Sequence, residues 1–292
     1  MKQHPKWRSP KFLEGLLKTL RYCGALSALP ILFLPAMAQA QTPSTLPEWT
    51  YSAGTLLRNK MMPSIPEWSV FAGISTAYSP WYDGANEHHW QGGPTVDIHY
   101  RDIAFFSTGE GLGVNLLRGE KYRAGTAITF DLGRRAKDAV ESNGLGNINP
   151  SPELKFFAEY MFFPAVLRVD ARRGLGGHNG WIADVGAYMP VYGSKKFFVF
   201  LGPSVTFADD RYMQNYFGVT ATQSANSAYS PYTAHAGLKS ANAGGSATWL
   251  VTDHWLVNVI AGGQRLLGDA ADSPLANDRI QYGTTMTVGY NF

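Results

Sequence analysis

The feature that most constrains the fold is an alternation of apolar and polar residues, repeated in segment after segment. In 282–292 the even positions are mostly apolar, and the odd positions carry glycine, threonine and asparagine. Period-two alternation is typical of a strand with one apolar face. Clusters of Gly, Pro, Asn and Asp separate these segments, as expected for turns between strands. The sequence therefore predicts an all-β chain.

Several segments carry charge on the face opposite the apolar one. In 95–101, 123–132 and 165–173, aliphatic and aromatic residues alternate with charged ones. A soluble β-sandwich buries the apolar face, whereas a transmembrane β-barrel turns it to lipid and lines its lumen with the polar face. For a barrel, the predicted lumen charges are Arg101, Arg123, Asp131, Arg168, Asp170, Arg172 and Asp184.

The beginning of the chain favours the barrel. A basic start is followed by the apolar run 25–37 and by "AQA" at 38–40, which predicts a secretory signal peptide over 1–40, cleaved after Ala40. Without this leader, which holds six Lys/Arg and one Glu, the 25 basic and 22 acidic residues become 19 and 21. No basic excess remains to indicate nucleic-acid binding. The one cysteine, Cys23, lies in the leader, so disulfides cannot stabilise the mature chain.

The spacing of the segments also favours the barrel. Short connections alternate with the long ones 78–92, 133–151, 207–235 and 267–279. Outer-membrane barrels have short periplasmic turns and long external loops. We expect a transmembrane antiparallel barrel of about twelve strands over 67–292, or ten if 102–108 and 112–118 are not two strands. The Pro-rich stretch 41–66 is predicted to be a periplasmic segment.

The last segment ends on aromatic residues. Tyr290 and Phe292 lie on its apolar face. A final aromatic residue is similar to the C-terminal signal that the outer-membrane assembly machinery recognises, so we expect contact with that machinery and with the lipid bilayer. The alternative is a soluble β-sandwich whose last strand ends in phenylalanine.

Specific stretches of the chain resemble the MipA/OmpV family. These are "YFGVTATQSANS" (216–227) with "YTAHAGLKS" (232–240), and "RLLGDAADSPL" (265–275) before the last strand. "GLGNINPSPELKFFAEY" (144–160), "GLGGHNGW" (174–181) and "YSPWYDGA" (78–85) are also similar to family segments, so the resemblance covers about 67–292. The family-signature residues, which are also possible interaction residues, are Phe217, Gly218, Val219, Thr220, Leu267, Gly268, Asp269, Asp272, Ser273 and Pro274.

The resemblance implies an integral protein of the Gram-negative outer membrane. It also implies a scaffold that holds a lytic murein transglycosylase of the MltA type and a class A penicillin-binding protein at that membrane. Other family members are described as porin-like or as adhesion proteins. The alternative from a different class is therefore a narrow pore for small solutes, and a third hypothesis is a hydrolase at the lipid interface.

The residues themselves predict no catalytic, cofactor or metal site. The histidines are scattered, and no G-x-S-x-G motif accompanies them. "EHHW" (87–90) offers two adjacent imidazoles in one predicted loop, which is rarely a complete metal site. We expect a protein that is not an enzyme and has no cofactor.

Overall fold

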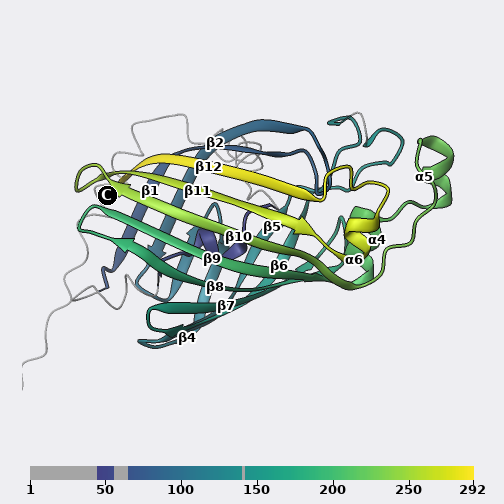
Figure 1. The fold of residues 1–292 in the computed structure, drawn as a ribbon. Helices are drawn as coiled ribbons and strands as arrows, with labels where there is room; N and C mark the ends of the chain where they lie inside the picture. The colour runs from purple at the N-terminus through teal and green to yellow at the C-terminus, as the bar shows by residue number, and fades with distance from the viewer. Residues whose placement is uncertain (1–44, 56–64, 140–141) are drawn as a thin grey trace, which may run out of the picture.

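The chain forms a closed barrel of antiparallel strands. The structure, a computed structural model, describes residues 45–55, 65–139 and 142–292. Within them, twelve strands pair in chain order and the first pairs with the last (Figure 1). The strands are β1 (Trp68–Pro80), β2 (His88–Tyr100), β3 (Ala104–Ser107), β4 (Gly111–Arg118), β5 (Tyr122–Asp131), β6 (Ser151–Phe162), β7 (Ala165–Gly174), β8 (Trp181–Gly193), β9 (Phe197–Ala208), β10 (Gly237–Leu250), β11 (Trp255–Leu266) and β12 (Ile280–Asn291).

The predicted barrel and its count of twelve strands are confirmed, and 102–108 and 112–118 contain two separate strands. One boundary differs: β2 begins at His88, inside the stretch 78–92 that the sequence indicated as a loop. The glycines and proline of β2 hid its alternation. The predicted signal peptide and its cleavage site lie outside the described residues.

Closure depends on the pairing of β1 with β12. These strands pair from Phe71 with Asn291 to Tyr78 with Thr284. Lipid offers no partner for a backbone N–H or C=O, so the two edge strands of an open sheet would be costly in a membrane. The pairing of the last strand with the first therefore removes the two edge strands that an open sheet would have.

The outer surface of the barrel is apolar. On β12, Tyr282 is 57% exposed and Val288 41%, and Phe292, directly after the strand, is 75% exposed. The other strands also expose large apolar side chains, among them Ile74, Phe156 and Leu201. Aromatic pairs such as Trp68–Tyr100 and Tyr78–Trp90 lie near opposite ends of their strands, where interfacial girdles occur. This is the surface of a membrane-spanning β-barrel.

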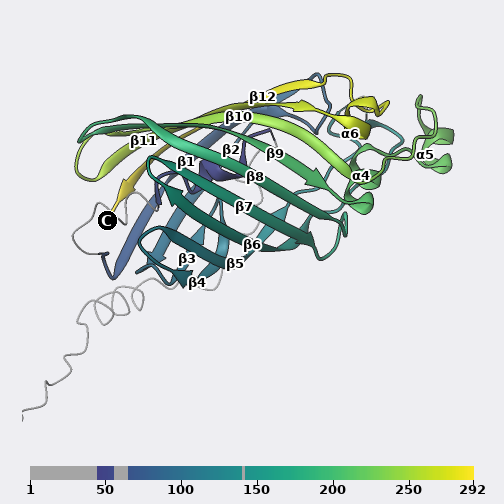
Figure 2. The same cartoon turned by 60° about the horizontal axis from the view of Figure 1, so that its bottom comes forward.

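The two ends of the barrel differ. The C-terminus lies at the end that carries the short turns, and α4 (Asp210–Phe217), α5 (Ala221–Asn226) and α6 (Gly268–Asp272) lie at the other end (Figures 1 and 2). By the usual asymmetry of such barrels, the first end is periplasmic and the second is external. None of the helices in the described part of the chain is long and apolar enough to cross a membrane.

A short 3-10 helix, η1 (Glu48–Tyr51), lies inside the barrel (Figure 1). Trp49 is 2% exposed, and Thr45, Leu46 and Thr50 are also buried. Residues 41–66 are predicted to be a periplasmic segment; the part of it that the structure describes, 45–55, packs against the inner wall. The alternation rule could not find this because the segment is aperiodic.

Candidate functional site

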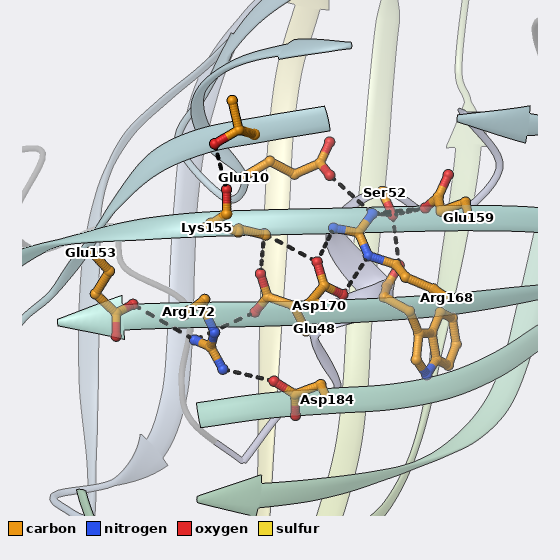
Figure 3. A network of polar contacts seen from close by, with 12 residues as sticks. Glu48, Ser52, Glu110, Glu153, Lys155, Glu159, Arg168, Asp170, Arg172 and Asp184 are labelled. Carbon is orange, nitrogen blue, oxygen red and sulfur yellow. Dashed lines mark hydrogen bonds and ion pairs between the residues drawn. The ribbon is translucent and has the colours of Figure 1, made fainter. Parts of the chain in front are cut away.

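The lumen holds a network of buried ion pairs (Figure 3). At its centre is Arg168 on β7, which is 1% exposed. Its Nε and Nη2 donate to the two carboxylate oxygens of Asp170, across 2.7 and 2.8 Å. Its Nη1 donates to Glu159 at 2.7 Å and to Glu110 at 3.1 Å. Such charge-assisted, bidentate bonds are the strong ones among protein hydrogen bonds.

A second arginine shares these carboxylates. Arg123 on β5 donates from Nε to Glu159 at 3.2 Å, and its Nη2 lies 3.5 Å from Glu110. The guanidinium carbons of Arg123 and Arg168 lie 5.2 and 5.5 Å from the ring centre of Phe157. Desolvated cations are stabilised over an aromatic face, so Phe157 supports both arginines where water does not reach.

The lumen segment 45–55 completes the network. Glu48 on η1 forms an ion pair with Lys155 on β6, and Arg172 lies 3.8 Å from Glu48. Arg172 also donates to Asp184 across 2.8 Å. Ser52 donates its hydroxyl to Glu159 at 2.8 Å. Without Glu48, the Lys155 ammonium would lose its shortest ion pair.

Apolar packing also holds this segment. The Trp49 ring stacks on Tyr188, with centroids 4.9 Å apart and planes 12° apart. Glycines on the facing strands make room: a Cβ on Gly186 would lie 2.9 Å from Cδ1 of Trp49, and one on Gly244 would lie 2.9 Å from Cδ of Pro47. The wall is therefore shaped to receive the segment.

Two carboxylates of the network lie outside the strands, and the pKa of each is strongly lowered. Burial acts to raise the pKa of Glu48, but Lys155 and Arg172 outweigh it and bring the pKa to about 2. The pKa of Glu110 also falls to about 2, because Arg123 and Arg168 outweigh its burial. Both groups are therefore ionised at neutral pH and take part in the network as charges.

The structure brings together most of the predicted lumen charges. Arg123, Arg168, Asp170, Arg172 and Asp184 all belong to the network described above. Asp131 also faces inward, near the external end, and accepts a hydrogen bond from Tyr216 across 2.7 Å.

Arg101 is the exception among these predictions. It lies in the turn after β2 with a φ of 49° and pairs with Glu67 at 3.3 Å, where both side chains are more than half exposed. The alternation of inward and outward residues ends at the turn, so the odd position of Arg101 no longer indicates which face of the sheet it lies on.

Several members of the network were not among the predicted lumen charges. Glu153, Lys155 and Glu159 share the odd parity of β6, and the burial pattern of that strand alternates throughout. Extending the parity rule to 152–162 would have found these three residues. No such rule finds Glu48 or Glu110, because neither lies on a strand.

The signature residues form a cap at the external end. Ser273 donates its hydroxyl to the carbonyl of Phe217 across 2.6 Å, and Val219 packs with Leu275 and Leu145 in a buried cluster. Asp269 accepts a hydrogen bond from the His235 amide at 2.8 Å. The two signature stretches, 217–220 and 267–274, therefore contact each other directly.

The other signature residues shape the loops locally. Thr220 caps α5 through a reciprocal capping box with Gln223, an arrangement that satisfies free amides at a helix start. Gly268 has a φ of +50°, which favours glycine. Asp272 forms an exposed ion pair with Arg279 at 3.2 Å.

One cluster below the cap has the composition of a metal site. Asp131, Glu153 and His178 place a ligand atom each within 4.8 Å of one another. However, Nδ1 of His178 accepts a hydrogen bond from the Gly180 amide at 3.0 Å, so Nε2 carries the proton. Nε2 then donates to Glu153 at 3.1 Å. With both ring nitrogens bonded, the cluster fits a hydrogen-bonded anchor for loop 175–180 better than a metal site.

A cleft lies at the periplasmic end. It has a volume of about 530 Å³ and is lined by Ile65, Arg101, Asp102, Ile103 and Arg118. Its lining combines two arginines, of which Arg101 is paired with Glu67, with one aspartate and two isoleucines.

Three solved structures illustrate how distant the similar barrels are. The outer membrane protein OprD from Pseudomonas aeruginosa matches at 9% identity with a TM-score of 0.32, over 77% of this chain and 59% of its own. OmpT of Vibrio cholerae matches at 8% identity with a TM-score of 0.34, over 78% of this chain and 98% of its own. The translocator domain of the autotransporter NalP from Neisseria meningitidis matches at 11% identity with a TM-score of 0.35, over 77% of this chain and 88% of its own. Likenesses this distant say nothing about what the present chain does.

The chain spans less than two thirds of the OprD length. No curated protein matches it. A family model does: the one described as MltA-interacting protein MipA matches residues 72–292, which is most of the chain and nearly all of the barrel. The protein therefore belongs to the MipA family.

Proposed function

We propose that this protein is a non-catalytic scaffold of the Gram-negative outer membrane. It holds a lytic murein transglycosylase and a class A penicillin-binding protein at the periplasmic face of that membrane. The family description supports the first of these partners. The observation that carries the proposal is the filled lumen: the ion-pair network and segment 45–55 occupy the space that a pore would need.

The filled lumen disfavours the narrow pore. The basic side chains of the network are almost fully buried: Arg123, Lys155 and Arg168 are each 1% exposed. They form ion pairs with carboxylates and do not face a water-filled channel. In ion-selective channels, by contrast, the rings of charged side chains face the water-filled pore. The hydrolase hypothesis gains no support from His178, whose ring nitrogens are both engaged.

Segment 45–55 is unsuited to be the main contact with a partner, because its described side chains lie in the lumen. The contact surface is instead the set of periplasmic turns, centred on the cleft beside Arg101 and Arg118. Arg118 is exposed, so its charge is available to a partner.

Direct binding tests the proposal. The folded protein in mild detergent is immobilised, and a purified MltA-type transglycosylase and a class A penicillin-binding protein of the same bacterium are passed over it. We expect saturable binding that the Arg118→Glu variant weakens about tenfold or more, since a rim charge reversal costs on the order of 1 kcal/mol or more. The matched control is Arg135→Glu, which reverses an exposed arginine in an external loop. Binding no stronger than to an unrelated barrel would overturn the proposal.

A further inference from the structure

The barrel wall is incomplete on one side. β3 pairs with β2 only from Asp97 to Tyr100. The pairing of β4 with β5 ends, toward the external side, at the pair Leu112–Ile128. In the described residues, no strand pairs with the edge of β2 from His88 to Thr95 on the side away from β1. The short hairpin thus leaves a gap between β2 and β5, roughly 14 Å across from three strand spacings of about 4.8 Å.

The gap is framed on all sides. The hairpin tip at Thr108–Glu110 forms its lower edge. At the external edge of the gap, the loop after β5 reaches the turn between β1 and β2, where Ala139 packs with Tyr82 and Ala85. On the outer surface, Trp90 is 68% exposed and Phe130 45%. The gap therefore opens sideways toward lipid, in the external half of the wall.

The sequence of β2 keeps this edge from pairing. Val96 exchanges hydrogen bonds with Thr108, its amide donating to Oγ1 and its carbonyl accepting from the Thr108 amide. Backbone groups alternate along a strand, so those of Pro94 and Gly92 also point into the gap. Proline has no N–H and occurs at free edges. Without Pro94, the first backbone N–H pointing into the gap would have no partner. The proline also disfavours the pairing of an additional strand.

The lumen face at the lower edge of the gap is polar and partly exposed. Asp97 lies on the lumen face and pairs with His99 at 2.8 Å, yet its side chain is 42% exposed. The lumen carboxylates of Glu159 and Asp170 are 0% and 2% exposed. Two acceptors therefore lie at or beside the gap: the Pro94 carbonyl and the Asp97 carboxylate, whose Oδ1 pairs with His99. The outer rim beside them is apolar.

We propose that this gap is a lateral binding site for an amphiphile from the external leaflet. The ligand carries a hydrogen-bond donor, such as an amine or a hydroxyl, close to its alkyl chain. The donor enters toward Asp97, and the chain stays against Trp90 and Phe130. A partner strand is disfavoured because Pro94 interrupts the row of donors that strand addition needs.

Fluorescence quenching tests this site. The only cysteine of the chain is Cys23, in the predicted leader, so the mature chain accepts a single labelled cysteine. Bimane is placed at Thr95→Cys, on the lumen side of the gap, and at the matched control Thr285→Cys, on the lumen face of the fully paired strand β12. The protein in nanodiscs then receives alkylamines or alkyl carboxylates of equal length, each with a nitroxide beside the head group.

We expect the alkylamine to quench bimane at position 95 severalfold more strongly than at position 285, and more strongly than the carboxylate does. Asp97→Asn should remove the preference for the amine. Equal quenching at both positions, or quenching at position 95 only by a water-soluble nitroxide, would overturn the proposal. So would a disulfide between two copies through Gly92→Cys, because that result would place a second edge in the gap.

Discussion

Ser273 and Phe217 are joined by a hydrogen bond of 2.6 Å that links loops 209–236 and 267–279 over the external end of the barrel. Ser273 also accepts a hydrogen bond from the Leu275 amide at 3.1 Å. One buried hydroxyl thus fixes the two signature stretches to each other. The resemblance found them as separate motifs, and the structure shows them as one unit.

Replacing Ser273 with alanine should loosen this cap. The Phe217 carbonyl would lose its partner while buried, which costs about 1–3 kcal/mol. We expect a lower thermal midpoint, with faster amide exchange in 217–220 than in the strands. The control is Ser230→Ala, at an exposed position of the same loop. Unchanged exchange in 217–220 would show that the hydroxyl does not hold the cap.

Removing Arg168 should destabilise the barrel strongly. Arg168→Met leaves Asp170, Glu159 and Glu110 buried with less compensation, a change that typically costs about 3–5 kcal/mol. The comparison is Arg101→Met, which breaks an exposed pair worth about 0–1 kcal/mol. Urea unfolding in detergent measures both. A similar loss for the two variants would contradict the account of the lumen network.

Glu48 predicts an acid-sensitive contact between segment 45–55 and the wall. Its pKa falls to about 2 in the folded protein from an ordinary 4.5. The unfolded state therefore binds the proton more readily, so the stability that Glu48 contributes is complete above pH 4.5 and is lost as the pH falls through about 2. Denaturant midpoints from pH 2 to 6 should rise with pH, and less steeply in Glu48→Gln. An identical slope in both proteins would refute this role.

Conductance should report the filled lumen. In planar bilayers we expect the intact protein to conduct far less than a general porin. Deletion of residues 45–55 should raise the conductance, because it removes Trp49 and Glu48 from the lumen and leaves Lys155 with only its longer ion pair to Asp170. The control replaces Asp253, an exposed turn residue, with asparagine. Large, steady channels in the intact protein would favour the narrow pore over the scaffold.

The strands could be predicted because lipid and lumen impose opposite chemistry on alternate residues. Parity placed Arg123, Arg168 and Asp184 correctly on the inner face. It failed at Arg101, where a turn ends the alternation, and at β2, where glycines and Pro94 carry no polarity signal.

The filling of the lumen could not be predicted in the same way. Glu48 meets Lys155 from a distant and aperiodic part of the chain, and Glu110 reaches Arg168 from a tight turn. Such contacts depend on where the barrel places its wall, which no local pattern records. The gap between β2 and β5 likewise follows from how short β3 is, and only the register shows it.

The proposed scaffold role requires that one molecule of this protein brings a murein hydrolase and a murein synthase together. The most direct measurement is bridging in a purified system: the labelled transglycosylase and penicillin-binding protein are mixed with the folded barrel in nanodiscs, and their proximity is read by energy transfer. We expect energy transfer that requires the barrel, declines when the barrel is in large excess and weakens in Arg118→Glu. Transfer that is independent of the barrel, or absent at every ratio, would contradict it.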